Sequence, residues 1–257
     1  MDLMLEGKSA LVSGSSRGIG FHIARDLARE GCNVLVNGRR DEDVDAAVEE
    51  IRRHGQGKIA GFAGDVTVAA TSDAFVGKAL EELGRIDLLV NNVGGSDPKA
   101  LVETTDEDWD RAFRSNLLHA VRISRAAVGE MKKSGGGAIL NVASIAGRES
   151  GSAMTYNAAK AALISFTKAL AQQVARDNIR VNSIAPGGIF FPGGVWERRM
   201  AESPDNLRSF IDANMPMGRF GRPEEVSAVA VFMLSPRASL VHGACWNVDG
   251  CQSRSNI

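Results

Sequence analysis

Short apolar runs alternate with amphipathic segments along most of the 257 residues. The apolar runs are rich in β-branched residues and predict strands at residues 9–13, 33–37, 59–64, 88–91, 138–142, 180–185 and 244–248. The segments between them predict helices at residues 18–30, 41–54, 70–83, 106–133, 155–176 and 223–234. In the second of these helices, for example, Val44, Val48 and Ile51 form an apolar stripe among charged side chains.

The alternation predicts an α/β fold built on one doubly wound parallel sheet. Strands that are apolar throughout are typical of parallel sheets with helices on both faces. Seven strands joined by right-handed crossovers suit one domain of this length. No repeat, low-complexity tract or linker divides the sequence. We therefore expect a single Rossmann-like domain over residues 1–257.

Residues 187–221 interrupt the alternation. This segment is long and rich in glycine and proline, with one short helix expected around residues 196–202. Long ordered loops often close over a bound ligand, so we expect a substrate lid here. Its large apolar side chains favour a substrate with an apolar portion. They are Phe190, Phe191, Trp196, Met200, Met215 and Met217.

Composition and charge narrow the classes of partner. The 30 basic and 31 acidic side chains nearly cancel, which argues against nucleic acid and anionic membranes. No stretch approaches the ~20 apolar residues of a membrane span, and residues 1–8 lack the apolar run of a signal peptide. The three cysteines lack the spacing of metal ligands, so we expect no metal site, no disulfide framework and a cytoplasmic location.

A glycine-rich turn follows the first expected strand and leads into the first expected helix. Glycines there allow positive φ angles and a close approach of a pyrophosphate, while the helix N-terminus offers free amides. The spacing is Gly-x-x-x-Gly-x-Gly, whereas the longer-known dinucleotide motif has Gly-x-Gly-x-x-Gly. A tight turn needs glycine for its own sake, but the position on the first strand favours a dinucleotide site. The candidate contacts are Gly14, Ser16, Arg17, Gly18, Ile19 and Gly20.

The end of the second strand indicates which nicotinamide cofactor is bound. An acidic residue there binds the adenosine ribose hydroxyls, whereas a basic one accommodates the extra phosphate of NADP(H). This strand leads into Arg39 and Arg40 with no acid, and Arg17 lies in the glycine turn. A solvated basic turn would have the same residues, but three arginines around one expected phosphate favour NADP(H). We expect Arg39 and Arg17 to hold that phosphate and Arg40 to point away.

Tyr156 and Lys160 are a candidate catalytic pair. Tyr156 is the only tyrosine, and Lys160 follows four residues later on an expected helix, so both lie on one face. A free phenol has a pKa of about 10, which a nearby ammonium lowers. A positioned acid/base of this kind contributes roughly 10²–10⁴ in rate. Such a pair also occurs on ordinary helix surfaces, but Ser144 at the end of the fifth strand lies where ligands of parallel sheets bind.

From Lys8 to Gly250 the chain resembles the short-chain dehydrogenase/reductase family. Besides the glycine turn and the Tyr/Lys pair, matching positions follow the third, fourth and sixth strands and the end of the chain. They are Asp65-Val66, Asn91-Asn92-Val93-Gly94, Asn116 in the long helix, Pro186-Gly187 and Val248-Asp249-Gly250. The resemblance implies the strand order 3-2-1-4-5-6-7 and a homotetramer. The helices at 106–133 and 155–176, which are apolar on more than one face, suit such pairing.

The resemblance also implies a tetrad of Asn116, Ser144, Tyr156 and Lys160. Tyr156 would give or take the proton, and Ser144 would polarise the reacting oxygen. Lys160 would bind the nicotinamide ribose and lower the pKa of the tyrosine, and Asn116 would hold a water in a proton relay. None of the departures from the family pattern touches these four residues.

Further family positions would hold the cofactor. Asp65 and Val66 would flank the adenine, and Asn92 and Gly94 would contact the cofactor through their backbone. After Pro186-Gly187 the family often has a Thr that holds the nicotinamide carboxamide, but Phe191 stands in this place. That anchor would then come from backbone, with Ile189 as the candidate.

The expected function is hydride transfer between NADP(H) and a small-molecule carbonyl or secondary alcohol. The 3-oxoacyl-carrier-protein reductases are the most similar subgroup, and an acyl carrier protein would favour basic residues at the cleft entrance. Lys132 and Lys133 could serve, but the acidic Asp177 ends the next expected helix, so this partner stays unsupported. NAD-dependent sugar, steroid or xenobiotic alcohol dehydrogenases share these motifs. A catalytically idle NADP(H)-sensing protein would also have these motifs, but the intact tetrad argues against that alternative.

Overall fold

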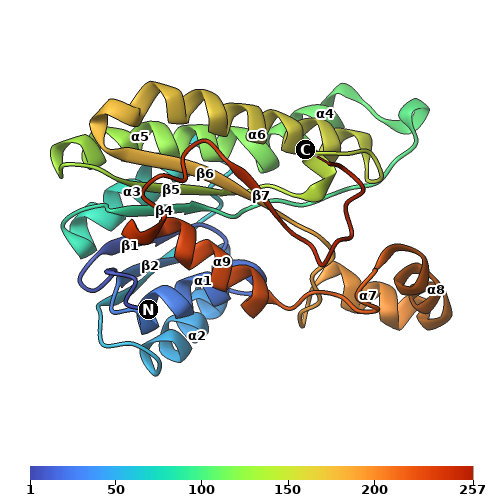
Figure 1. The fold of residues 1–257 in the computed structure, drawn as a ribbon, viewed down its shortest axis with the longest axis horizontal. Coiled ribbons are helices and arrows are strands. Elements are labelled where there is room, and N and C mark those ends of the chain that lie inside the picture. Colours follow the sequence, from blue (N-terminus) through green and yellow to red (C-terminus); the bar gives the residue numbers. More distant parts are fainter. Residues whose placement is uncertain (257) are drawn as a thin grey trace.

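Seven strands form one parallel sheet in the order β3-β2-β1-β4-β5-β6-β7 in the computed structural model, which describes residues 1–256 (Figure 1). This order and the doubly wound α/β fold confirm the prediction. The strands are β1 (Ser9–Val12), β2 (Asn33–Gly38), β3 (Ile59–Ala63), β4 (Leu88–Asn91), β5 (Gly137–Val142), β6 (Ile179–Pro186) and β7 (Cys245–Val248).

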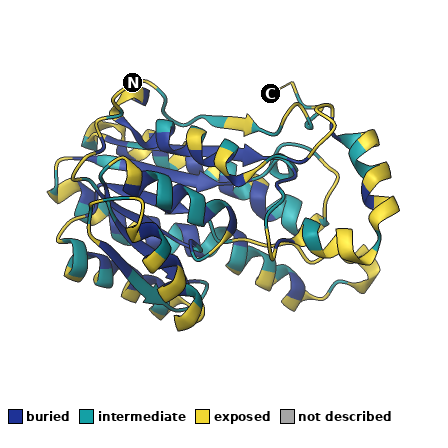
Figure 2. Ribbon diagram, turned by 90° about the horizontal axis from the view of Figure 1, so that it is seen from below, coloured by how far each residue is buried: buried dark blue, intermediate teal, exposed yellow. Residues whose placement is uncertain are grey.

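Helices cover both faces of the sheet, and each face has its own apolar core (Figure 1). On one face lie α1 (Gly18–Arg29), α2 (Asp41–Arg52) and α9 (Pro223–Leu234). On the other lie α3 (Ala69–Leu83), α5 (His119–Lys133) and α6 (Met154–Val174). Side chains alternate between the two cores along each strand, as in β2, where Val34 and Val36 join the first core and Leu35 the second. Figure 2 shows the buried strands enclosed by helices with exposed outer surfaces.

The helix expected at residues 106–133 is interrupted. It consists of α4 (Asp106–Phe113), a π-helical segment (Arg114–Leu118) and α5. The Asn116 side chain donates to the Ala112 carbonyl at 3.0 Å inside this segment. Such π segments are frequent at functional sites. The apolar periodicity continues across the segment, so the sequence pattern did not reveal it.

Residues 187–221 contain more helix than the sequence indicated. The expected short helix is α7 (Val195–Glu202), but a second helix, α8 (Pro204–Asn214), follows it directly. The two helices project from one end of the molecule (Figure 1). They enclose a small core of buried Leu207, Met215 and Phe220. The Trp196 ring packs against the Phe220 ring at 4.7 Å between centroids.

The sequence predicts no membrane span, no metal site and no disulfide framework. Within residues 1–256, no helix combines the length and apolar character needed to cross a membrane. The described part of the chain also contains no cluster of three or more His, Cys, Asp or Glu side chains that could hold a metal ion. Cys32, Cys245 and Cys251 are free thiols.

Candidate active site and cofactor cleft

The predicted site residues lie at the carboxyl ends of six neighbouring strands. Because the strands are parallel, these ends meet along one edge of the sheet, which is where ligands of such folds bind. The residues that follow β1 to β6 in turn are Gly14, Arg39, Asp65, Asn92, Ser144 and Ile189.

The glycine turn between β1 and α1 brings the backbone into close contact with itself. Gly14 and Gly18 have φ angles of +61° and +59°, and a Cβ on Gly20 would lie 2.4 Å from the Gly14 carbonyl oxygen. Asn92 Nδ2 donates to that oxygen at 2.9 Å, and Asn37 Oδ1 accepts from the Gly14 amide at 3.0 Å. Glycine is therefore required here for the packing of the turn as well as for any ligand.

The N-terminus of α1 is open to an anion. Among the described residues, no side chain caps this helix, whose N-cap is Arg17. The amides of the first turn, from Gly18 to Gly20, therefore remain available to phosphate oxygens. Ser16 packs closely on Gly38, where a Cβ would lie 2.8 Å from the Ser16 Oγ. The residues present fit a diphosphate group held by backbone amides.

The arginines beyond β2 divide into two groups. Arg40 is paired with Asp43, with its Nη2 2.6 Å from the Asp43 Oδ1, and so points away from the turn as expected. Arg39 is exposed and has no hydrogen-bond or ion-pair partner in the part of the chain that the structure describes. Arg17 Nη1 donates only to the Gly193 carbonyl, at 3.3 Å. All three arginines lower the pKa of the Asp43 carboxyl, so their positive fields overlap beside α2.

Lys160 and Tyr156 lie together beneath the cleft. Lys160 is 2% exposed, and its Nζ donates to the Val142 carbonyl at 2.8 Å and lies 5.7 Å from the centre of the Tyr156 ring. Burial lowers the pKa of Lys160 to about 7. Burial also raises the pKa of Tyr156, and a hydrogen bond with Ser144 opposes this only partly. The pKa of Tyr156 is therefore raised, and not lowered as expected, because burial disfavours the charged phenolate.

Ser144 and Asn116 hold the other two positions of the predicted tetrad. The Ser144 Oγ accepts from the Ala146 amide at 3.1 Å, which fixes the hydroxyl at the start of the short helix Ile145–Gly147. Asn116 is fully buried and exchanges two hydrogen bonds with the Gly95 backbone, at 3.0 and 2.9 Å. A Cβ on Gly94 would lie 2.7 Å from Asn116 Oδ1 and 3.0 Å from Lys160 Nζ. Only glycine lets the chain pass this point.

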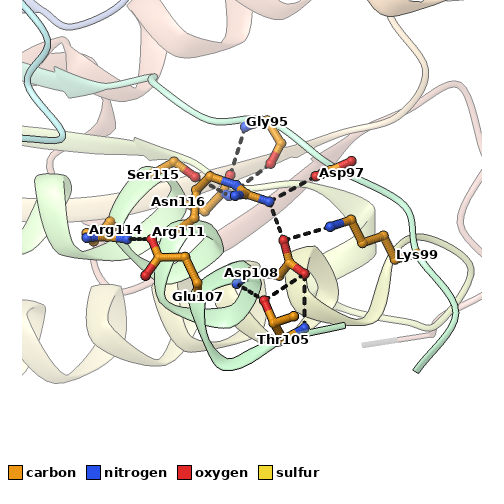
Figure 3. Close-up of polar contacts among 10 residues, drawn as sticks. All are labelled: Gly95, Asp97, Lys99, Thr105, Glu107, Asp108, Arg111, Arg114, Ser115 and Asn116. Atoms are coloured by element: carbon orange, nitrogen blue, oxygen red, sulfur yellow. Dashed lines mark hydrogen bonds and ion pairs between the residues drawn. The ribbon is translucent and has the colours of Figure 1, made fainter. Parts of the chain in front are cut away.

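A polar network fixes the segment that carries Gly95 (Figure 3). Asp108 lies at its centre, where it accepts from Lys99 Nζ at 2.8 Å and from the Thr105 amide at 3.0 Å. Arg111 pairs with the same carboxylate and with Asp97. These contacts attach residues 95–105 to α4, and through Gly95 they hold Asn116 in place.

Three further residues that were predicted to contact the cofactor differ in exposure and in backbone orientation. Asp65 is exposed, whereas the Val66 side chain is buried in the core, so Val66 could contact a ligand only through its backbone. Ile189 forms a parallel bridge with Gly221, whose hydrogen bonds use the Gly188 carbonyl and the Phe190 amide. The amide and carbonyl of Ile189 therefore face away from Gly221.

Phe191 lies against the glycine turn. A Cβ on Gly18 would be 2.7 Å from the Phe191 Cε2, so the ring is in close contact with the backbone there. Together with the bond between Arg17 and Gly193, this contact joins the lid segment to the turn.

Comparison with known proteins identifies the family. The family model described as Enoyl-(Acyl carrier protein) reductase matches residues 14–251. The 3-oxoacyl-[acyl-carrier-protein] reductase FabG of Chlamydia muridarum is 37% identical over 252 residues, which are 97% of this chain and 99% of that protein. The chain belongs to the short-chain dehydrogenase/reductase family. It is an oxidoreductase of this family.

Solved structures of short-chain dehydrogenases/reductases superpose over nearly the whole chain. The L-sorbose reductase of Gluconobacter frateurii, complexed with NADPH and L-sorbose, has a TM-score of 0.94 and 34% identity, covering 99% of this chain and 100% of that one. A 7 alpha-hydroxysteroid dehydrogenase complexed with NADH and 7-oxo glycochenodeoxycholic acid has a TM-score of 0.90 and 31% identity, covering 99% and 97%.

The C-terminal tail of this short-chain dehydrogenase/reductase connects the base of the lid to the loop before Tyr156, which the sequence did not indicate. Gln252 Oε1 accepts from the Gly188 amide at 2.7 Å, at the base of the lid. Glu149, in the loop before Tyr156, accepts from Ser253 Oγ at 3.0 Å and from the Arg254 amide at 2.8 Å. No local motif encodes these contacts, because they join segments 64 to 105 residues apart.

Asn37 is a second residue that sequence reasoning missed. Its buried side chain accepts from Gly14 and donates to the carbonyls of Phe62 and Gly64, so it connects three strand ends. The signal was present as a polar residue inside an otherwise apolar strand.

The suggestion that Lys132 and Lys133 could form a basic entrance to the site is wrong. Lys132 and Lys133 end α5 just before β5 begins, whereas the tetrad lies at the other end of β5. Lys132 is paired with Asp177 and Lys133 with Glu130. Because α5 runs antiparallel to the strands, its last turn lies at the edge of the sheet opposite the site.

Proposed function

We propose that the protein transfers a hydride between NADP(H) and a carbonyl or secondary alcohol, with Tyr156 as acid/base. The observation that carries the proposal is the buried Lys160 beside the half-buried Tyr156, near Ser144 at the strand edge that also holds the glycine turn. A buried ammonium beside a phenol has no evident structural purpose, whereas proton transfer to substrate requires both groups.

The glycine turn and the surrounding loops would hold the cofactor. The first-turn amides of α1, from Gly18 to Gly20, would bind the diphosphate. Asp65 and the Val66 backbone would flank the adenine, and Asn92 and Gly94 would lie along the ribose and nicotinamide side. The Ile189 amide and carbonyl, which face away from Gly221, would hold the carboxamide. When bound, the nicotinamide supplies or accepts the hydride.

Arg39 and Arg17 support NADP(H) over NAD(H). Arg40 is occupied by Asp43, so these two guanidiniums remain for the 2′-phosphate. The NADPH complex of the similar L-sorbose reductase agrees with this choice. The similar hydroxysteroid dehydrogenase binds NADH, so NAD(H) is the alternative that a cofactor assay must test.

The residues of the tetrad divide the proton chemistry among them. In the reduction, Ser144 donates a hydrogen bond to the substrate carbonyl oxygen, and Tyr156 Oη gives that oxygen its proton as the carbon gains the hydride. The phenolate that results is stabilised by the Lys160 ammonium and is then protonated again. In the oxidation each transfer is reversed, and Tyr156 takes the alcohol proton.

The lid favours a substrate that has an apolar part. Met217 and the aromatic cluster of Phe190, Trp196 and Phe220 lie beside the base of the lid. A 3-oxoacyl thioester would fit this lining, and similarity to FabG supports that class. The similar solved structures contain a sugar and a steroid acid, so ketoses and ketosteroids belong in the same assay panel.

The test is Tyr156→Phe, assayed by NADPH oxidation across acyl thioesters, ketosteroids, ketoses and quinones. The variant loses only the acidic proton, so turnover should fall by about 10²–10⁴. NADPH affinity, measured by fluorescence, should change less than threefold. Ser150→Ala, an exposed change in the preceding loop, should retain the parent rate. Turnover by Tyr156→Phe within threefold of the parent would refute the assignment. A parent that binds NADPH and reduces nothing in the panel would indicate an idle sensor.

A further inference from the structure

The C-terminal tail packs closely against the first residues of the lid. After β7 the chain reaches the base of the lid and then turns back (Figure 1). There Gln252 Oε1 accepts from the Gly188 amide at 2.7 Å. A Cβ on Gly187 would lie 2.5 Å from the same oxygen and 2.9 Å from the Asp249 Cβ. The tail therefore leaves no room for a side chain on Gly187.

The backbone that follows has a fixed orientation. The Gly188 carbonyl accepts from the Gly221 amide at 2.9 Å, and the Phe190 amide donates to the Gly221 carbonyl at 2.9 Å. These bonds orient the two peptide groups on either side of Ile189. Because neighbouring groups along an extended chain point to opposite sides, the Ile189 amide and carbonyl face away from Gly221.

The peptide group just before this bridge lies between two glycines. Glycine has the widest choice of backbone angles, so a pair of glycines cannot hold a peptide group in one orientation by itself. The hydrogen bond from the Gly188 amide to Gln252 supplies that restraint from a residue 64 positions further along the chain. Gln252 thus determines how the chain enters the bridge that orients Ile189.

The tail is itself held in place, so Gln252 is a fixed acceptor. The Gln252 amide donates to the Asp249 carbonyl at 3.1 Å, and the Asp249 carboxylate accepts from the Ser253 amide at 2.8 Å. Glu149, in the loop before α6, accepts from Ser253 Oγ at 3.0 Å and from the Arg254 amide at 2.8 Å. Contacts on both sides of Gln252 therefore anchor it to the body of the protein.

We propose that Gln252 is a positioning residue for the nicotinamide end of the cofactor, a role that rests on the function proposed above. By fixing the Gly188 amide, it keeps the Ile189 amide and carbonyl directed at the carboxamide. A carboxamide has an acceptor oxygen and N–H donors, which match these two backbone groups. Phe191 has no polar side-chain atom to offer, so the orientation of this backbone determines how well the carboxamide is held.

The test compares the binding of NADPH with that of 2′-phospho-ADP-ribose, which lacks the nicotinamide. Gln252→Met is unbranched and has no amide acceptor, so it frees the Gly188 amide. It should weaken NADPH binding about three- to tenfold, as expected for one lost hydrogen bond, and leave the binding of the fragment nearly unchanged. Isothermal titration calorimetry measures both affinities without turnover.

Two further variants provide the rescue and the matched control. Gln252→Glu keeps an acceptor oxygen at the same side-chain length, so the ratio of its two affinities should stay close to the parent's. Gln56→Met makes the same change at an exposed residue between α2 and β3, and it should leave both affinities unchanged.

The outcomes separate this inference from the function on which it rests. If Gln252→Met weakens both ligands equally, or neither, the positioning role of Gln252 is overturned, while the assignment of Tyr156 stands on its own test. If the parent binds neither NADPH nor NADH, the proposed function is overturned as well. For a parent that prefers NADH, the pair NADH and ADP-ribose gives the same comparison.

Discussion

At the scale of single residues, Lys160 is an ionisable side chain that is buried away from water. Its pKa of about 7 lies far below the value of about 10.4 for a lysine in an unfolded chain. Between these two values the unfolded chain binds more protons than the folded one, so the free energy of unfolding rises with pH across this range. The ammonium therefore costs most stability below pH 7.

Lys160→Met should reveal that cost. At pH 6 the variant should be more stable than the parent by about 1–4 kcal/mol, because it removes a buried ammonium that makes one hydrogen bond. The advantage should shrink between pH 7 and 10 and should come with lost activity. Urea unfolding at each pH measures it. Lys168→Met, an exposed change on the same helix, should show no such trend. A stability difference that is constant with pH would contradict the assignment.

Arg39 carries the prediction on cofactor choice. A hydrogen bond to a charged group contributes roughly 1.5–3 kcal/mol, which corresponds to a preference for NADP(H) of roughly 10- to 150-fold. Arg39→Asp should reverse the preference, because a carboxylate repels the phosphate and accepts from the free ribose hydroxyls. The measurement is the ratio of kcat/KM for the two cofactors.

Arg40→Ala is the control for that measurement. Its guanidinium is held by Asp43, so the ratio should change little. A parent enzyme that favours NAD(H) would show that the end of β2 was misinterpreted, without affecting the proton chemistry of Tyr156.

The sequence predicted which residues line the cleft better than it predicted their electrostatic state. Motif spacing places Tyr156, Lys160 and Ser144 at one edge, and the structure brings these three together. The raised pKa of Tyr156 depends on how many atoms enclose it, which spacing does not encode.

At the scale of elements, the lid is the segment whose order should depend on ligand. It has its own small core and meets the body through the bridge between Ile189 and Gly221 and the bond from Arg17 to Gly193. NADP(H) bound on the glycine turn should add contacts to this segment. Amide exchange in residues 190–200 should then slow several-fold, while α9 stays unchanged. Equal protection with and without NADP(H) would count against a lid.

The predicted and observed boundaries of helices and strands agree where apolar periodicity determines them. The strands and the helices that cover the sheet agree with prediction to within one or two residues. The lid helix α8 was missed although Pro204 and Asp205 form a typical helix start, because its apolar stripe packs within the lid instead of on the sheet. The π segment was missed because it adds a residue to a turn without changing which side chains are apolar.

At the scale of the whole molecule, we expect a homotetramer. On α6, Ala161 and Ala169 are exposed, so a second helix could approach closely. The edge strand β7 carries the exposed Trp246, and the loop before it carries the exposed Leu240. Isologous contacts over these two surfaces would produce a closed assembly of four chains. Light scattering at micromolar concentration should give four times the chain mass, and Ala169→Arg should reduce it. A stable monomer in the parent would refute this expectation.

The enclosure of Tyr156 beside Ser144 also makes the protein its own spectroscopic probe. A phenolate absorbs ultraviolet light at longer wavelengths than a phenol, and the chain contains one tyrosine. Any phenolate band that appears in a difference spectrum therefore belongs to the proposed acid/base, without labelling or isotopic editing. Spectrophotometric titration can follow the charge on this one oxygen directly, with and without each cofactor, in the unmodified protein.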